Sequence, residues 1–266
     1  MAIIEDYYSW NEQLRQKYEK LWPDAAYHIW DGVVSPKDYA DSYLKVMFLN
    51  KESFDDPENG GYDISLGMAK EIFESKPILG GENSTMMMTT KNRLAVLKLL
   101  EGDIKNVNSI EIGSIIRNFS TDRFRKEMLK VAYCNIKKSS GRSKSIKRDL
   151  RFNFSKNREI IEEQISYFNP TLIVGGNIVD GIIENEIEWG ENLYISESHY
   201  INIFQLMIKG KEYPFIDAYH PAMPKLKNEE NQEKDCLELF KALLYVEERY
   251  PNFWKNRCGQ ECFINE

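Results

Sequence analysis

The chain has 266 residues, of which 42% are hydrophobic and 29% are charged, and its formal net charge is −7. This composition is typical of a globular protein, and the acidic balance argues against a protein that coats nucleic acid through its overall field. No apolar run approaches the roughly 20 residues that a membrane helix requires. The chain reaches Glu5 and Asp6 without the basic start of a signal peptide, so we expect a cytoplasmic protein that has no membrane partner.

One domain is expected over residues 1–266, because no segment rich in proline, glycine and serine divides the chain. An amphipathic helix over residues 5–21 belongs to an N-terminal helical extension of about residues 1–42, and a tail of about residues 251–266 ends the chain. The cysteines are too few and too scattered for a disulfide framework: Cys134, Cys236, Cys258 and Cys262. The last two are close enough to join a metal site, but no second close pair completes the usual four-ligand set.

The apolar run from Val46 to Leu49 predicts a buried strand, and the polar residues 50–53 predict a turn after it. Ligands of open α/β sheets bind at the carboxyl ends of parallel strands. Glu52 is therefore a candidate catalytic carboxylate, and the alternative interpretation is a solvated turn acid. The glycine-, asparagine- and aspartate-rich residues 55–67 predict a loop that can cover a ligand at this strand end.

A second short strand, Val131 to Asn135, ends in an amide and precedes a basic stretch. Residues 137–151 contain seven basic side chains and one acid, Asp149. Serine and glycine lie between the basic residues, and this mixture suits contacts to phosphate groups. The alternative interpretation is a solvated loop.

A helix over residues 156–167 is followed by a buried strand over residues 171–174, a Gly-Gly-Asn turn at 175–177 and a helical stretch, which is the pattern of a doubly wound unit. The turn lacks the G-x-G-x-x-G pattern of a dinucleotide site. A later strand over residues 213–219 leads into His220, and Pro221 fixes the backbone after it. Residues 184–213 read as a variable excursion, and residues 235–250 as a final amphipathic helix.

Polar residues thus follow three predicted strands, and their order resembles the uracil-DNA glycosylase superfamily. In that superfamily a first strand ends in a motif such as GQDPY or GEAPG, a middle strand ends in an asparagine often followed by a basic segment, and a late strand ends in HPS or HPA. The corresponding segments here read NKESF, AYCNIKK and AYHPAM, and the similarity spans about residues 43–245. Asn50 and Ser53 replace the usual glycine and proline, Lys51 stands where one branch keeps its acid, and the cysteines do not match the iron–sulfur branch.

The resemblance implies an α/β fold, namely a three-layer αβα sandwich around a central, mostly parallel sheet. It implies a monomeric DNA glycosylase that flips a deaminated or modified pyrimidine out of the duplex and hydrolyses its N-glycosidic bond without a cofactor. The product is an abasic site. Uracil is the default substrate of the superfamily, whereas a hypermodified phage base would make the protein an antiviral defence enzyme rather than a DNA repair enzyme.

The resemblance also assigns roles to residues. Glu52 would orient water or stabilise the positive charge on the sugar, and His220 would hydrogen-bond the departing base. The remaining assignments are base binding by Asn50, Phe54 and Asn135, phosphate contacts by Lys137, Lys138, Arg142 and Lys144, and filling of the vacated base stack by Met223 or Leu226. Two alternatives stay open: a catalytically silent DNA-binding module of the same fold, and a nucleotide-using Rossmann-like enzyme that relies on residues 175–177.

Overall fold

The structure, a computed structural model, describes residues 2–25, 28–54, 62–78, 81, 84–141, 145–197 and 201–261. A six-stranded sheet has the order β4-β2-β5-β8-β7-β6, with bounds β2 (Val46–Phe54), β4 (Val131–Gly141), β5 (Leu172–Gly176), β6 (Glu188–Ile195), β7 (Ile201–Ile208) and β8 (Lys211–Ala218). Strands β4, β2, β5 and β8 are parallel to one another, and β7 is antiparallel to both of its neighbours. The predicted mostly parallel sheet is confirmed.

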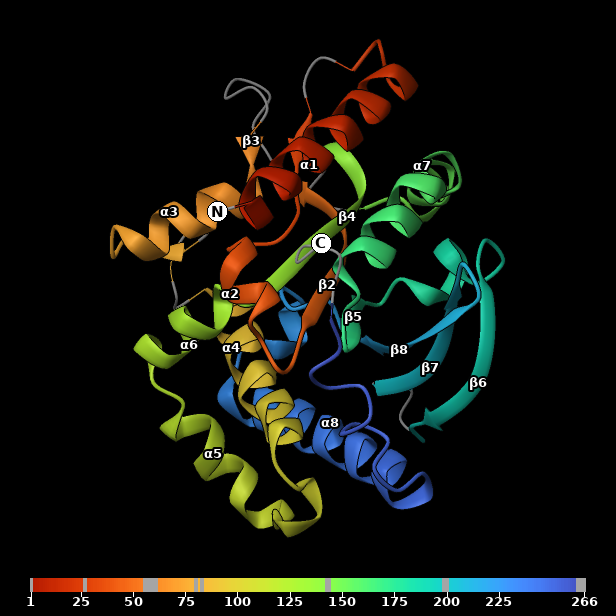
Figure 1. Ribbon diagram of the computed structural model, residues 1–266. Helices are drawn as coiled ribbons and strands as arrows, with labels where there is room; N and C mark the ends of the chain where they lie inside the picture. Colours follow the sequence, from red (N-terminus) through yellow and green to blue (C-terminus); the bar gives the residue numbers. More distant parts are fainter. Residues whose placement is uncertain are drawn as a thin grey trace.

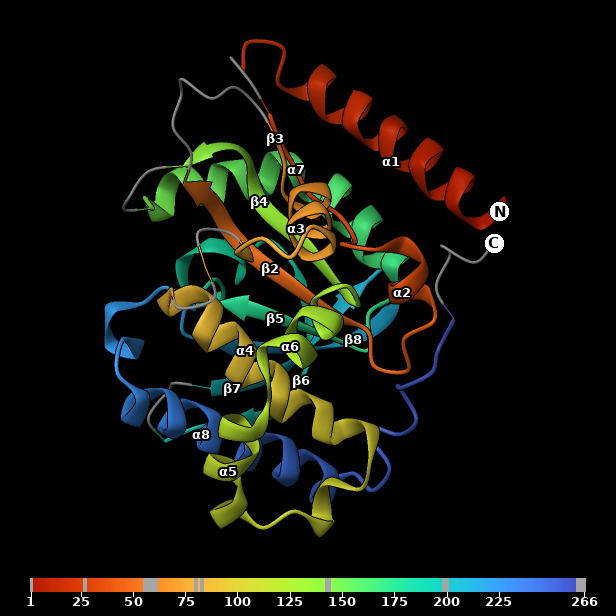
Figure 2. The ribbon, with the colours of Figure 1, turned by 90° about the vertical axis from the view of Figure 1, so that its left-hand side faces the viewer.

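Helices cover both faces of this sheet and make the predicted three layers (Figure 1). Helices α1 and α7 lie on one side, and α4, α5, α6 and α8 lie on the other, as Figure 2 also shows. The helices are α1 (Ala2–Leu21), α2 (Pro36–Ala40), α3 (Ile64–Phe73), α4 (Thr85–Leu97), α5 (Ile112–Asn118), α6 (Thr121–Met128), α7 (Lys147–Phe168) and α8 (Glu229–Arg249). A separate pair of two-residue parallel strands joins β1 (Ile29–Trp30) to β3 (Tyr62–Asp63).

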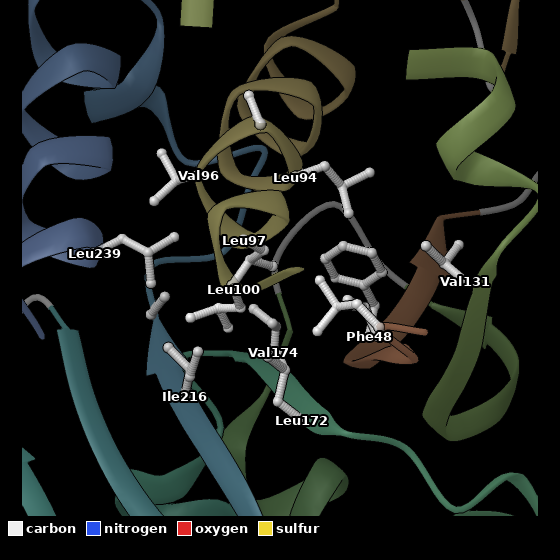
Figure 3. Close-up of a cluster of buried hydrophobic side chains, with 14 of the residues drawn as sticks. Phe48, Leu94, Val96, Leu97, Leu100, Val131, Leu172, Val174, Ile216 and Leu239 are labelled. Carbon is white, nitrogen blue, oxygen red and sulfur yellow. The ribbon is translucent and has the colours of Figure 1, made fainter. Parts of the chain in front are cut away.

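The two faces of the sheet bury different residues of the same strands, because side chains alternate along a strand. On the α4 and α8 side, Phe48 of β2 packs with Val174 of β5 and with helix residues such as Leu94 (Figure 3). On the α7 side, Met47 and Leu49 belong to a second buried cluster. The continuous apolar run that predicted β2 therefore reflects a strand that is buried on both faces.

Three elements are longer than the sequence predicted. Strand β2 continues through residues 50–53, which were expected to form a turn, and β4 continues through the start of the basic stretch. The reason is mutual pairing, since Glu52 of β2 lies in register with Lys137 of β4. Helix α7 begins at Lys147, nine residues before the predicted start. Residues 184–213, expected as a variable excursion, contain the antiparallel strands β6 and β7.

The outer edge of β4 is covered by the chain that precedes α2. The backbone N–H of Tyr133 donates to the carbonyl of Gly32 over 2.8 Å, and the N–H of Val34 donates to the carbonyl of Val131 over 3.0 Å. Covering the edge removes unpaired backbone groups that would otherwise pair with another chain. It also brings Asp31 against β4. No helix in the described part of the chain is long and apolar enough to cross a membrane.

The order of the parallel strands creates a switch point between β2 and β5. After β2, the chain places β4 on one side of it, and then returns to place β5 on its other side. In open α/β sheets, ligands bind at the carboxyl ends of the strands that flank such a reversal. The carboxyl end of the sheet at β4, β2, β5 and β8 is therefore the region to search for a functional site.

Candidate functional site

Glu52, Asn135 and His220 are three of the residues selected from the sequence, and the strands that carry or precede them end at this edge of the sheet. Asn50 of β2 lies in register with Asn135 of β4. On the other side of the switch point, Gly176 of β5 pairs with Ala218 of β8, and His220 follows two residues later. Since all four strands are parallel, their ends share one edge of the sheet. Three segments far apart in the sequence thus lie at one edge, as predicted.

Glu52 is a buried, ion-paired carboxylate within β2, not a solvated acid in a turn. Its side chain is 5% exposed, and its Oε2 atom lies 3.4 Å from Nζ of Lys137. The same ammonium lies 3.1 Å from Oδ2 of Asp149, at the start of α7. Because two carboxylates surround the Lys137 ammonium, its charge is compensated within the protein. Contact with a DNA phosphate would therefore compete with Glu52 and Asp149.

His220 is held as a neutral hydrogen-bond donor. Its Nδ1 accepts the backbone N–H of Ala222 over 3.2 Å, which assigns the ring proton to Nε2. Burial lowers the pKa of His220 to about 4, and the cations of Lys51 and Arg93 act in the same direction. At neutral pH the imidazole is therefore uncharged, and its Nε2–H remains to donate to a ligand.

Arg93 of α4 supports the backbone in front of this histidine. Its guanidinium donates to both carboxylate oxygens of Asp235, over 2.8 and 2.9 Å, and to the carbonyl of Tyr219, over 2.8 Å. Both side chains of the ion pair are buried. A further support is Gly176, where a Cβ atom would lie only 3.1 Å from Cδ2 of His220. A residue without a side chain at this position lets the imidazole pack against the end of β5.

Asp217, near the end of β8, binds the turn that follows β5. Its side chain accepts the backbone N–H of Ile178 over 3.1 Å. Burial raises the pKa of Asp217 to about 6, while the backbone N–H groups of residues 177–179 and the Lys51 cation oppose this rise. The donors of the Gly-Gly-Asn turn are thus directed to a carboxylate of the protein itself. A nucleotide phosphate would have to displace Asp217 to use them.

Lys138 was predicted to contact DNA phosphates, and this prediction is wrong. Its side chain is 3% exposed, and its Nζ donates to both carboxylate oxygens of Asp31 over 2.7 and 2.8 Å. Asp31 also accepts from Nε2 of Gln164 over 2.9 Å and from the backbone N–H of Asn135 over 2.7 Å. Neighbouring strand residues point to opposite faces, so Lys137 and Lys138 have different environments despite their adjacency.

The remaining predicted residues have mixed outcomes. Asn135 is buried, with 3% of its surface exposed, and Met223 is half-buried after the His220 turn. Leu226 lies in the core, so it cannot fill a base stack. Cys258 is buried as well. Arg142, Lys144 and Cys262 lie outside the described residues, and so does the side chain of Phe54.

Sequence reasoning missed Asp31, Arg93 and Asp217. Asp217 had a signal in the sequence, since it is the one acid inside the apolar strand over residues 213–219. Arg93 is a cation next to the apolar stretch Leu94–Leu97 of α4. Their partners lie far away along the chain, so only the fold reveals the pairing. Among the described residues, no group of three or more His, Cys, Asp and Glu side chains is arranged to hold a metal ion.

No family model, curated protein or solved structure matches this chain.

Proposed function

We propose that the protein is a DNA glycosylase that releases a flipped pyrimidine by hydrolysis of its N-glycosidic bond. The observation that supports this best is the pair of groups at the carboxyl end of the sheet, a buried carboxylate at Glu52 and a neutral N–H donor at His220. The assignment of the sandwich to the uracil-DNA glycosylase fold is part of the same proposal.

The chemistry needs both kinds of group. Breaking the bond between sugar and base builds positive charge on the sugar and negative charge on the departing base. A carboxylate beside the sugar stabilises the first charge and orients the attacking water, and an N–H donor beside the base stabilises the second. A neutral imidazole suits the second role, because its Nε2–H donates at every pH above about 4 without adding a full charge to the free enzyme.

Base recognition is assigned to the amides of Asn50 and Asn135. An amide offers one acceptor and two donors, which match the hydrogen-bonding edge of a pyrimidine. The two residues lie in register on neighbouring strands. The Asn135 backbone is fixed by its bond to Asp31. Hydrogen bonds from these amides to the base help to recover the few kcal/mol that flipping a base out of the duplex costs.

DNA contacts are assigned to the exposed start of α7, where Lys147 and Arg148 precede Arg151. Lys147 influences the pKa of Lys51, so this basic surface lies within electrostatic range of the site. A local basic surface reconciles phosphate binding with the negative charge of the whole chain. Met223, which is partly exposed, is the candidate that fills the stack in place of the flipped base.

The nucleotide-using alternative loses support from the turn after β5. Asp217 already accepts a backbone N–H of this turn. The glycines have packing reasons, because a Cβ atom at Gly175 would lie 2.4 Å from the Phe215 ring. The silent DNA-binding module is the remaining competitor, and only an activity measurement separates it from a glycosylase.

The test is base release from a panel of duplexes that contain uracil, 5-hydroxymethylated pyrimidine or glucosylated pyrimidine. Free base is read by mass spectrometry and abasic sites by alkaline cleavage, without added metal or nucleotide. Glu52→Gln and His220→Ala are each expected to lower the rate about 100- to 1000-fold. Lys234→Ala on α8, an exposed residue paired with Glu230, is the matched control and should keep the full rate.

Full activity of both site variants would overturn the roles assigned here. Binding of flipped or abasic DNA without release of any base would instead favour the silent module. The released base also decides the biological role. Uracil would indicate repair of deaminated DNA, and a glucosylated base would indicate defence against phages with modified genomes.

A further inference from the structure

Lys51 differs from the other lysines at the carboxyl end of the sheet. Lys137, Lys138 and Lys147 each have a carboxylate oxygen within 4.0 Å. Lys51 lies between Asn50 and Glu52 in β2 and is half-buried, yet it makes no hydrogen bond or ion pair with any residue in the described ranges. Its amine is therefore not engaged by any residue that the structure describes.

Lys51 belongs to β2, the strand whose carboxyl end carries Glu52, and neighbouring charges act on its ammonium. Asp217 exerts the largest charge effect on it, followed by Lys147 and Glu52. Lys51 in turn lowers the pKa of His220. Burial dominates these effects and lowers the pKa of Lys51, so its ammonium loses a proton more readily than that of an exposed lysine. A lysine with a neutral amine is a nucleophile toward carbonyl carbon.

We propose that Lys51 gives the protein a second activity, cleavage of the DNA strand at an abasic site through a covalent imine. The inference rests on the proposed function, because base release from DNA leaves an abasic sugar in the same site. The ring-opened form of that sugar is an aldehyde at C1′. In this proposal the Lys51 amine, at the carboxyl end of the strand that also carries Glu52, attacks this aldehyde.

The reaction balances with water as the one co-reactant. The lone pair of Nζ forms a bond to C1′ while the π electrons of the C=O bond move to the oxygen. The resulting carbinolamine takes up one proton from solvent and loses one water molecule to give the protonated imine. The imine makes the C2′–H acidic, and solvent water takes up this proton. The C3′–O bond then breaks, with its electron pair leaving on the 3′ phosphate. Addition of one water molecule to the imine restores the amine and releases an unsaturated aldehyde on the 5′ fragment.

The experiment uses the full chain and two substrates, a duplex with the base that the panel identifies and a duplex with a preformed abasic site. Borohydride reduces an imine to a stable amine, so it converts the intermediate into a covalent protein–DNA adduct that is visible on a denaturing gel. We expect the adduct and the cleaved strand with the wild-type protein. Lys51→Arg keeps the positive charge but not the nucleophile, and should lower adduct formation roughly 100-fold or more. Lys234→Ala is the matched control and should form the adduct as the wild type does.

Mapping of the wild-type adduct by peptide mass spectrometry tests the assignment even if the variant does not fold. A DNA remnant on Lys51 supports the inference, and a remnant on another residue overturns it. Base release without adduct from either substrate overturns the lyase activity and leaves the glycosylase proposal intact. Adduct from the preformed abasic site without release of any base supports Lys51 and counts against the glycosylase proposal.

Discussion

The candidate site has two halves, the end of β4 and the turn that carries His220, and a buried ion pair supports each of them. Lys138 and Asp31 support the end of β4, and Arg93 and Asp235 support the turn that carries His220. Both pairs connect distant parts of the chain, 107 and 142 residues apart. They differ in which partner connects to the site. At β4 the partner that contacts the site is the acid, Asp31, and at His220 it is the cation, Arg93.

Asp31 is the centre of the first pair, because it accepts from Lys138, Gln164 and the backbone N–H of Asn135. In the second pair the guanidinium of Arg93 is the centre, since it binds Asp235 and the carbonyl of Tyr219. Removing one partner of a buried pair is costly because it leaves an uncompensated charge. The comparison therefore predicts which substitution costs more stability in each pair. In the first pair it is the replacement of the acid, Asp31, and in the second pair it is the replacement of the cation, Arg93.

The largest loss of stability is expected for Asp31→Ala. The substitution leaves the Lys138 ammonium buried and also removes the acceptor for Gln164 and for Asn135, so the loss should lie near the upper end of about 3–5 kcal/mol. Lys138→Met leaves two donors on Asp31 and should cost less. Urea unfolding at pH 7 measures both variants. Equal losses would show that Asp31 is not the centre of its network.

Arg93→Met should cost about 3 kcal/mol, because it leaves Asp235 buried without its cation. It also removes the donor to the Tyr219 carbonyl, so base release should fall with it. Asp235→Asn keeps an acceptor for Arg93 and the Tyr219 contact, so it should cost less stability than Arg93→Met and change the rate little. Unfolding and base-release assays on the two variants make the comparison. Slower base release by the Asp235→Asn variant than by the Arg93→Met variant would contradict the comparison.

The His220 half of the site also predicts opposite effects of pH from two neighbouring groups. Folding lowers the pKa of His220 to about 4, so its stabilising effect is present above its ordinary pKa of 6.5 and is lost as the pH falls toward 4. Folding raises the pKa of Asp217 to about 6, so its stabilising effect is present below its ordinary pKa of 3.8 and is lost as the pH rises through 6. Between pH 4 and pH 6.5 the two effects oppose each other.

Single substitutions should separate these two effects. With Asp217→Asn, the free energy of unfolding should fall by about 2–3 kcal/mol more than in the wild type when the pH is lowered from 7 to 4. With His220→Gln, the free energy of unfolding should instead rise relative to that of the wild type as the pH is lowered from 7 to 4. Urea unfolding at several pH values measures both differences. If both substitutions shift the pH dependence in one direction, the two pKa values are not displaced as described.

The sequence predicted the sheet and the convergence of the site better than it predicted the supports. The apolar runs that became β2, β4, β5 and β8 were recognisable because these strands are buried on both faces. The position of Glu52 at the carboxyl end followed from the same pattern. Lys138 was misassigned, because composition shows that a segment is basic but does not show which of two adjacent lysines enters the core.

The supports themselves could not be predicted, because their partners are set by the fold. Asp31 meets Lys138 only because the chain before α2 covers the edge of β4. Arg93 meets Asp235 because α4 and α8 lie on the same side of the sheet (Figure 2). Nothing within a few residues of Asp31 or Arg93 indicates these partners. Buried charges of this kind become evident when long-range topology is known.

The smallest expected effect is that of Gly176→Ala. This substitution tests the position of the His220 imidazole with little change in the stability of the protein. A Cβ atom here would lie 3.1 Å from Cδ2 and 3.4 Å from Cα of His220, so the imidazole must move by a few tenths of an ångström. Because a displacement of 1 Å can cost about 100-fold in rate, Gly176→Ala should slow base release roughly 3- to 10-fold, with a change in stability below about 1 kcal/mol. Gly102→Ala is the matched control, since its Cβ would meet one backbone oxygen at 3.8 Å, which is ordinary contact. Full activity of Gly176→Ala would mean that the close packing of His220 on β5 does not position the donor.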